Sequence, residues 1–160
     1  MRAGLISVML VMASGQVVDA ATMDQIVRNC ARAQDQLTEV ALSDQAMALQ
    51  LTRNYHHILE NMLMPMNERL IRNGRFVEPL VRTSSEVAAT IVEWEEDVTS
   101  YINKLQTLRA VNCVTEPEMF AAGLSDTRAA RAWLVLQNQQ MLDLLTEYQA
   151  ALPAILESDI

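Results

Sequence analysis

One segment decides the fold of this chain: LVRTSSEVAATIVEWEEDVTSYINKLQTL, from Leu80 to Leu108. Its apolar side chains recur at alternating spacings of four and three residues, with one serine completing the series. The series comprises Leu80, Ser84, Val87, Ile91, Trp94, Val98, Tyr101, Leu105 and Leu108. This alternation places one apolar stripe along a helix and is typical of helices that pack side by side. The segment therefore predicts a long helix, beginning near Pro79, whose stripe is covered by other helices.

A second stripe with the same alternation follows near the C-terminal end. Its positions are Phe120, Leu124, Thr127, Arg131, Leu134, Asn138, Met141, Leu145, Tyr148 and Leu152. Thr115-Glu-Pro-Glu118 precedes it and has the pattern of a capped helix start. The Thr hydroxyl caps the first backbone N–H groups, Pro lacks an N–H that would be unpaired there, and the Glu side chain reaches back to the N–H of the cap residue. We predict a last helix that frays near Pro153.

The first part of the chain carries its own helix punctuation. Thr22 to Gln25 has the capping-box pattern of a helix start, and Asn73-Gly74 has the pattern of a stop. Ser43-Asp44 is a second cap candidate, so this region is either one long helix or two. The sum is an all-α fold: an antiparallel bundle of three to four long helices, with short connections, in a single domain over residues 21–160.

Composition agrees with this fold class and excludes two kinds of partner. The 160 residues are 51% hydrophobic but only 4% aromatic, and they include four Gly and four Pro, which favours helices over strands. The formal net charge is −8, so we expect neither nucleic acid nor an anionic membrane surface as a partner. An acidic chain is better matched to a basic protein.

Residues 1–20 have the pattern of a signal peptide. Arg2 is followed by the apolar run Leu5 to Met12, and Val18 and Ala20 occupy the −3 and −1 positions of a small-residue cleavage site. The apolar run is too short to span a bilayer, which needs about 20 residues. We therefore predict an exported protein (periplasmic, cell-surface or extracellular) that starts near Ala21 and keeps no integral membrane segment.

The two cysteines fit an exported protein. Cys30 and Cys113 are the only thiols, and in an oxidising compartment such a pair predicts a disulfide. Closing a loop of about 84 residues stabilises a fold by about 4 to 5 kcal/mol on the chain-entropy model. The alternative is a cytosolic protein with two buried free thiols.

The stretch YHHILENMLMPM, from Tyr55 to Met66, is the one candidate metal site. In an unbroken helix its thioethers do not converge, but Pro65 disfavours helical backbone at the preceding residue, and an extended chain would bring alternate residues to one side. Imidazole and thioether ligands suit copper(I), so the candidate ligands are His57, Met62, Met64 and Met66. The preferred interpretation is simpler: Met fills irregular core space beside a proline. The acidic run Glu93 to Asp97 is interpreted as a solvated surface.

No catalytic motif is present in the sequence. It has no Gly-rich phosphate loop, nucleophile elbow or HExxH pattern, so we expect a non-enzymatic protein without a cofactor. The preferred function is a structural or protein-interaction module of the cell envelope or exterior. It would bind another protein, or a copy of itself, through helical surfaces, with polar stripe residues such as Ser84 or Asn138 setting register. The alternative is a soft-metal (copper) or small-ligand carrier that uses His57 to Met66.

The run from Tyr101 to Leu152 resembles a pattern in uncharacterised exported helical proteins of small-genome bacteria. The pattern is a long helix, a Cys before a Pro-containing turn, a Phe shortly after, then an Arg pair and a final helix. The matching positions are Cys113, Pro117, Phe120, Arg128 and Arg131. The resemblance covers about a third of the chain. It implies an exported helical protein and carries no activity.

Overall fold

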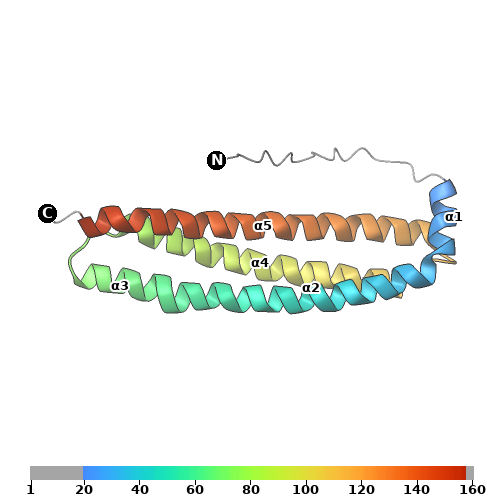
Figure 1. Ribbon diagram of the computed structural model, residues 1–160, viewed down its shortest axis with the longest axis horizontal. Helices are drawn as coiled ribbons and strands as arrows, with labels where there is room; N and C mark the ends of the chain where they lie inside the picture. Colours follow the sequence, from blue (N-terminus) through green and yellow to red (C-terminus); the bar gives the residue numbers. More distant parts are fainter. Residues whose placement is uncertain (1–19, 158–160) are drawn as a thin grey trace, which may run out of the picture.

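The computed structural model describes residues 20–157, and the predicted leader therefore lies almost wholly outside it. Helices account for all of the regular structure in this range, so the predicted all-α class is confirmed. Three long rods lie side by side, and a short helix crosses one end (Figure 1). The elements are α1 (Ala20–Arg28), α2 (Cys30–Ile58), the π-helical turn η1 (Leu59–Leu63), α3 (Met64–Arg72), α4 (Glu78–Ala110) and α5 (Pro117–Glu157). The chain reverses twice, so α4 runs antiparallel to both neighbours.

The first long rod consists of α2, η1 and α3 without a break. Ser43, the candidate point of division, is an exposed residue inside α2, so the undivided alternative is the one observed there. A break lies instead at Asn29, whose side-chain Nδ2 donates to the Gln25 carbonyl at 2.8 Å. Asn29 satisfies a carbonyl at the end of α1, whereas Ser43 does not interrupt the backbone ladder.

Pro65 does not unwind the rod, because a wider turn accommodates it. The N–H of Met64 bonds to the carbonyl of Leu59, five residues earlier, which is the π-helical pattern. Proline lacks an N–H and its ring clashes with the carbonyl four residues before it, so an extra residue in the preceding turn relieves the conflict. The buried residues Tyr55, Leu59, Leu63 and Asn67 are accordingly spaced four apart. The extended backbone from Met62 to Met66, which the metal-site alternative required, is not formed, because the segment is helical.

Both reversals have local causes. Gly74, at φ 73°, ends α3 as predicted, and the N–H of Arg75 bonds back to the Leu70 carbonyl at 3.0 Å. Before α5, the side-chain oxygen of Asn112 accepts the N–H of Val114 at 3.0 Å and so forms the turn. Because α5 begins at Pro117, the residue in the cap position is Glu116, one residue after the predicted Thr115.

The stripe of α4 forms the core of the molecule. Every predicted position from Leu80 to Leu108 is buried except Val98, which is half-buried. Both other rods pack on α4, and α1 crosses the end against α5. On α5 the buried residues recur at every seventh position, with one addition, Gln137; the series is Phe120, Thr127, Leu134, Met141, Tyr148 and Ile155. The other predicted stripe positions on α5 are half-buried or exposed, so part of that stripe is not covered.

The predicted disulfide is present. Cys30 and Cys113 are bonded, their Cα atoms lie 5.5 Å apart, and both side chains are buried. The bond ties the first residue of α2 to the connection between α4 and α5. Among residues 20–157, no helix combines the length and the apolar character that crossing a bilayer requires.

Candidate interaction groove between α2 and α5

A groove separates α2 from α5 at the middle of the molecule. No Cα atom of α2 comes within 8 Å of a Cα atom of α5, although both helices approach α4 that closely. In Figure 1, α4 lies between the other two rods. The groove has a volume of about 710 Å³. Its lining residues come from all three helices: Asp44, Met47, Ala48, Leu51, Trp94, Tyr101, Arg128, Arg131, Ala132, Leu134, Val135 and Asn138.

Asp44 joins the three helices at one end of the groove. Its carboxylate accepts the hydroxyl of Tyr101 from α4 at 2.5 Å. It also accepts Nε and a terminal nitrogen of Arg131 from α5, at 2.7 and 3.0 Å. Sequence reasoning placed Asp44 at a candidate helix cap and Arg131 at a stripe position of the last helix, and it missed that the two residues bond to each other.

A second polar cluster lies further along the same groove. The hydroxyl of Tyr55 donates to the side-chain oxygen of Asn138, and the ring of Tyr55 meets Trp94 edge-on at 5.7 Å between centroids. Trp94 in turn donates its indole N–H to Thr52 at 2.9 Å. These contacts connect α2 to α5 and α4.

A third cluster closes the far end of the rods. Asn67 accepts the hydroxyl of Tyr148 at 2.7 Å and donates to Ser84 at 2.8 Å, and all three side chains are buried. The hydroxyl of Ser84 in turn donates a hydrogen bond to the Leu80 carbonyl at 2.8 Å. The three clusters differ in composition, so sliding one rod past another by a turn would leave buried polar groups without partners. Ser84 therefore helps to fix the register of the rods within the molecule.

The Asp44 cluster alters the acidity of its members. Burial of the Tyr101 hydroxyl, helped by its bond to the Asp44 carboxylate, raises the pKa of Tyr101 far above its ordinary value. The same carboxylate raises the pKa of Arg131 through their hydrogen bonds. Both groups therefore keep their protons, and Asp44 is held as an acceptor whose two oxygens are already used.

Large apolar side chains remain exposed along the groove. Met47 on α2 is 56% exposed and Val135 on α5 is 65% exposed. The eleven residues from Ala132 to Leu142 contain no charge. Four of the eleven are amides and the rest are apolar, and because α4 covers only one side of α5, apolar side chains such as Val135 and Leu136 stay exposed.

The charge along the groove differs from that of the whole chain. Its lining holds one carboxylate, Asp44, against the guanidinium groups of Arg128 and Arg131. Arg131 is paired, whereas within residues 20–157 Arg128 forms no ion pair. Of the acidic run on α4, Glu93, Glu95 and Glu96 are exposed as predicted. Asp97 is half-buried instead, because it accepts the indole N–H of Trp133 and the amide of Gln137 from α5.

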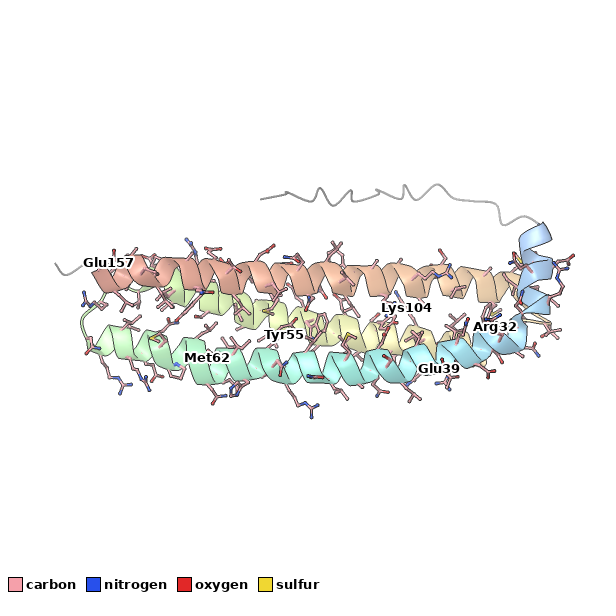
Figure 2. The ribbon with its side chains drawn as sticks, in the orientation of Figure 1. Arg32, Glu39, Tyr55, Met62, Lys104 and Glu157 are labelled. Atoms are coloured by element: carbon pink, nitrogen blue, oxygen red, sulfur yellow. A yellow bond between two sulfur atoms is a disulfide. The ribbon has the colours of Figure 1, made fainter. Side chains whose placement is uncertain are left out.

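The candidate metal ligands do not gather at one point. Met62, Met64 and Met66 are 56%, 50% and 37% exposed, so the preferred interpretation as core filling was wrong for these three methionines. They lie off the stripe that α4 covers. Met62, on the same rod as Tyr55 (Figure 2), shares a helix face with Met66 but not with Met64. His57 is exposed and its Nδ1 pairs with Asn61 at 3.2 Å. Among residues 20–157, no group of three His, Cys, Asp or Glu side chains is placed to hold a metal ion.

His56, the other histidine of this stretch, contacts two carboxylates, whereas His57 contacts one amide. The Nε2 atom of His56 lies 3.0 Å from Glu95 on α4, and its Nδ1 atom lies 3.3 Å from Glu60 on the same rod. The bond to Glu95, supported by Glu60, raises the pKa of His56. Sequence reasoning missed this bridge, since the spacing of four to Glu60 was visible but the position of Glu95 was not.

Comparisons with known proteins neither support nor contradict the resemblance described for Tyr101 to Leu152. Comparison of the chain with protein families, curated proteins and solved structures finds no match. The positions that carry the resemblance have separate structural roles. Cys113 and Phe120 are buried, Pro117 begins α5, and Arg128 and Arg131 line the groove.

Proposed function

We propose that this protein is an exported, non-enzymatic interaction module, folded as an open antiparallel helical bundle, that binds another protein through the groove between α2 and α5. One observation carries the proposal. Both rods pack on α4 but stand apart from each other, and the space between them is lined by exposed apolar side chains. Exposed apolar grooves rimmed by polar residues are typical of protein-interaction sites.

The composition of the groove favours binding over catalysis. Its one carboxylate, on Asp44, already accepts bonds from Tyr101 and Arg131 and is not free to act as a base. The rest of the lining consists of aliphatic, methionine and aromatic side chains, one amide and the guanidinium groups of Arg128 and Arg131. Such a lining offers area and shape complementarity, which are the needs of an interface, but no activated nucleophile.

Export is part of the same proposal. The disulfide between Cys30 and Cys113 is compatible with an oxidising compartment, where such bonds persist. The signal-peptide pattern of residues 1–20 is a second, independent argument for export to such a compartment.

The test uses two apolar residues of α2, Met47 and Leu49, that are equally exposed but point in different directions. Met47 lines the groove and is 56% exposed, whereas Leu49 is 57% exposed and does not line it. Tagged full-length protein, Met47→Asp and Leu49→Asp would each be expressed in the source cell and purified from the envelope and culture medium. We expect a partner to be recovered with the parent protein and Leu49→Asp but not with Met47→Asp. Equal recovery with both variants would contradict the proposal.

A soft-metal carrier is the second candidate, because Met62 and Met66 are exposed on one face of the rod. This candidate predicts that the protein competes with a colorimetric chelator for copper(I). The ligands would be His57, Met62 and Met66, with Met64 as the further candidate. Met62→Leu and Met66→Leu would then weaken binding at least tenfold, since each removes a thioether. Equal competition by the parent protein and the double variant would exclude this candidate.

A further inference from the structure

We propose that the occupant of the groove is an amphipathic helix of the partner protein that presents an acidic side chain to Arg128. This inference rests on the proposed function and narrows it to one class of partner. It draws on three features of the groove: its walls, its apolar lining and its charge.

The walls of the groove match the space that one helix takes. α2 and α5 run in the same direction on either side of α4. The three helices therefore occupy three of the four positions of a four-helix bundle. A helix lying over the groove would complete that arrangement, diagonally opposite α4. The polar contacts of Asp44 and Tyr55 with α5 cross the base of the groove, so the incoming helix would pack above them.

The apolar lining has the spacing that an amphipathic helix recognises. Met47 and Leu51 are four residues apart on α2, and they face Val135 on α5. Two such rows, one on each wall, accept a stripe of residues spaced at three and four. Methionine is adaptable, and Met47 would adjust to the shape of an incoming side chain.

The charge of the lining selects an acidic helix. Arg128 is the exposed guanidinium of the groove that forms no ion pair within residues 20–157, and it stands in a lining with a net charge of +1. An acidic side chain beside it would gain an ion pair that excludes part of the solvent, whereas a basic one would be repelled. Glu93, Glu95 and Glu96 belong to α4 and do not line the groove. Their negative charges would repel an acidic helix from the surface of α4 that they occupy.

A second copy of the chain is a poorer occupant. The groove needs a helix with an uncovered apolar stripe, and the regular stripe of α4 is buried and not available to another copy. Two copies would also bring together formal charges of −8 each. Self-association is therefore kept as an outcome of the test.

The experiment is a selection with a display library of 18-residue helical peptides. The library fixes apolar residues at i, i+3, i+4, i+7 and i+11, and it varies all flanking positions among Glu, Gln and Lys. The full disulfide-bonded chain serves as bait. Selected peptides are then measured against Val135→Asp, Leu136→Asp and Arg128→Glu by fluorescence anisotropy. Val135 and Leu136 form a matched pair, because they are 65% and 61% exposed on the same helix and only Val135 lines the groove.

We expect three results. Selected peptides lose at least tenfold in affinity for Val135→Asp and keep their affinity for Leu136→Asp. They share a glutamate at one fixed position relative to the apolar stripe. Replacing that glutamate with lysine weakens binding to the parent protein by about fivefold and strengthens binding to Arg128→Glu, in line with the energies of partly exposed ion pairs.

Other outcomes overturn the inference. Peptides that bind without a preferred charge, or that bind Arg128→Glu equally, would remove Arg128 from the site. An empty selection, or sedimentation showing a dimer of the chain that Val135→Asp dissociates, would show that the occupant is not a helix of this kind. In either case the recovery experiment with Met47→Asp and Leu49→Asp still reports separately on the proposed function.

Discussion

Removing the Asp44 carboxylate tests how the three rods are joined. In Asp44→Ala, the hydroxyl of Tyr101, a residue only 2% exposed, loses its acceptor and stays buried. A buried unsatisfied donor costs about 1 to 3 kcal/mol. Arg131 is 57% exposed and returns to water, so its lost ion pair adds about 0.2 to 1 kcal/mol. We therefore expect Asp44→Ala to lower the free energy of unfolding by about 1 to 4 kcal/mol.

The assay is urea unfolding of the disulfide-bonded chain, followed by circular dichroism. Adding Tyr101→Phe to Asp44→Ala removes the unsatisfied hydroxyl, so the double variant should be more stable than Asp44→Ala alone by about 1 kcal/mol. The control is Asp143→Ala on the exposed face of α5, which should change stability by less than about 0.5 kcal/mol. The reasoning is refuted if Asp44→Ala behaves like this control, or if Tyr101→Phe destabilises it further.

Three further predictions follow from other contacts. Replacing Cys30 and Cys113 with Ser should lower the free energy of unfolding by about 4 to 5 kcal/mol, measured as a lower urea midpoint; an unchanged midpoint would contradict the role given to the bond. His56 should titrate by NMR above its ordinary value of 6.5, with Glu95→Gln lowering its pKa. Because the pKa of His56 is raised in the folded state, the bridge contributes its full stabilisation below pH 6.5, and this stabilisation is lost as pH rises through the folded pKa. If the parent protein and Glu95→Gln showed the same pH profile of stability, the bridge would not contribute. Asn67→Ala should cost about 2 to 3 kcal/mol in the same urea assay, since it removes the shared partner of Tyr148 and Ser84, and a loss below about 0.5 kcal/mol would show that the cluster does not contribute.

The helical class and the covered stripe of α4 were predictable because they depend on local order in the sequence. The four-three spacing from Leu80 to Leu108 specifies which face of one helix is apolar, and Gly74 specifies where another ends. The break at Asn29 and the π-helical turn before Pro65 were not predictable in this way. Each depends on a local competition for backbone hydrogen bonds that residue type alone does not decide.

The groove was hidden from sequence reasoning for a different reason. Arg131 and Asn138 stand where a covered stripe would have apolar residues, and this was a visible sign that part of the α5 stripe meets no helix. The sign does not identify which helix is missing. That answer depends on the separation of α2 and α5, which is a property of the packed molecule.

The most direct test of the central claim, that this groove is a binding surface, is site-specific photo-cross-linking. Benzoylphenylalanine would be placed at position 135 or at position 136 of the full chain in the source cell, and the products would be separated without reduction. The account predicts a discrete adduct with another protein from position 135 and none from position 136, since only Val135 lines the groove. Equal adducts from both positions, or an adduct from 136 alone, would contradict it.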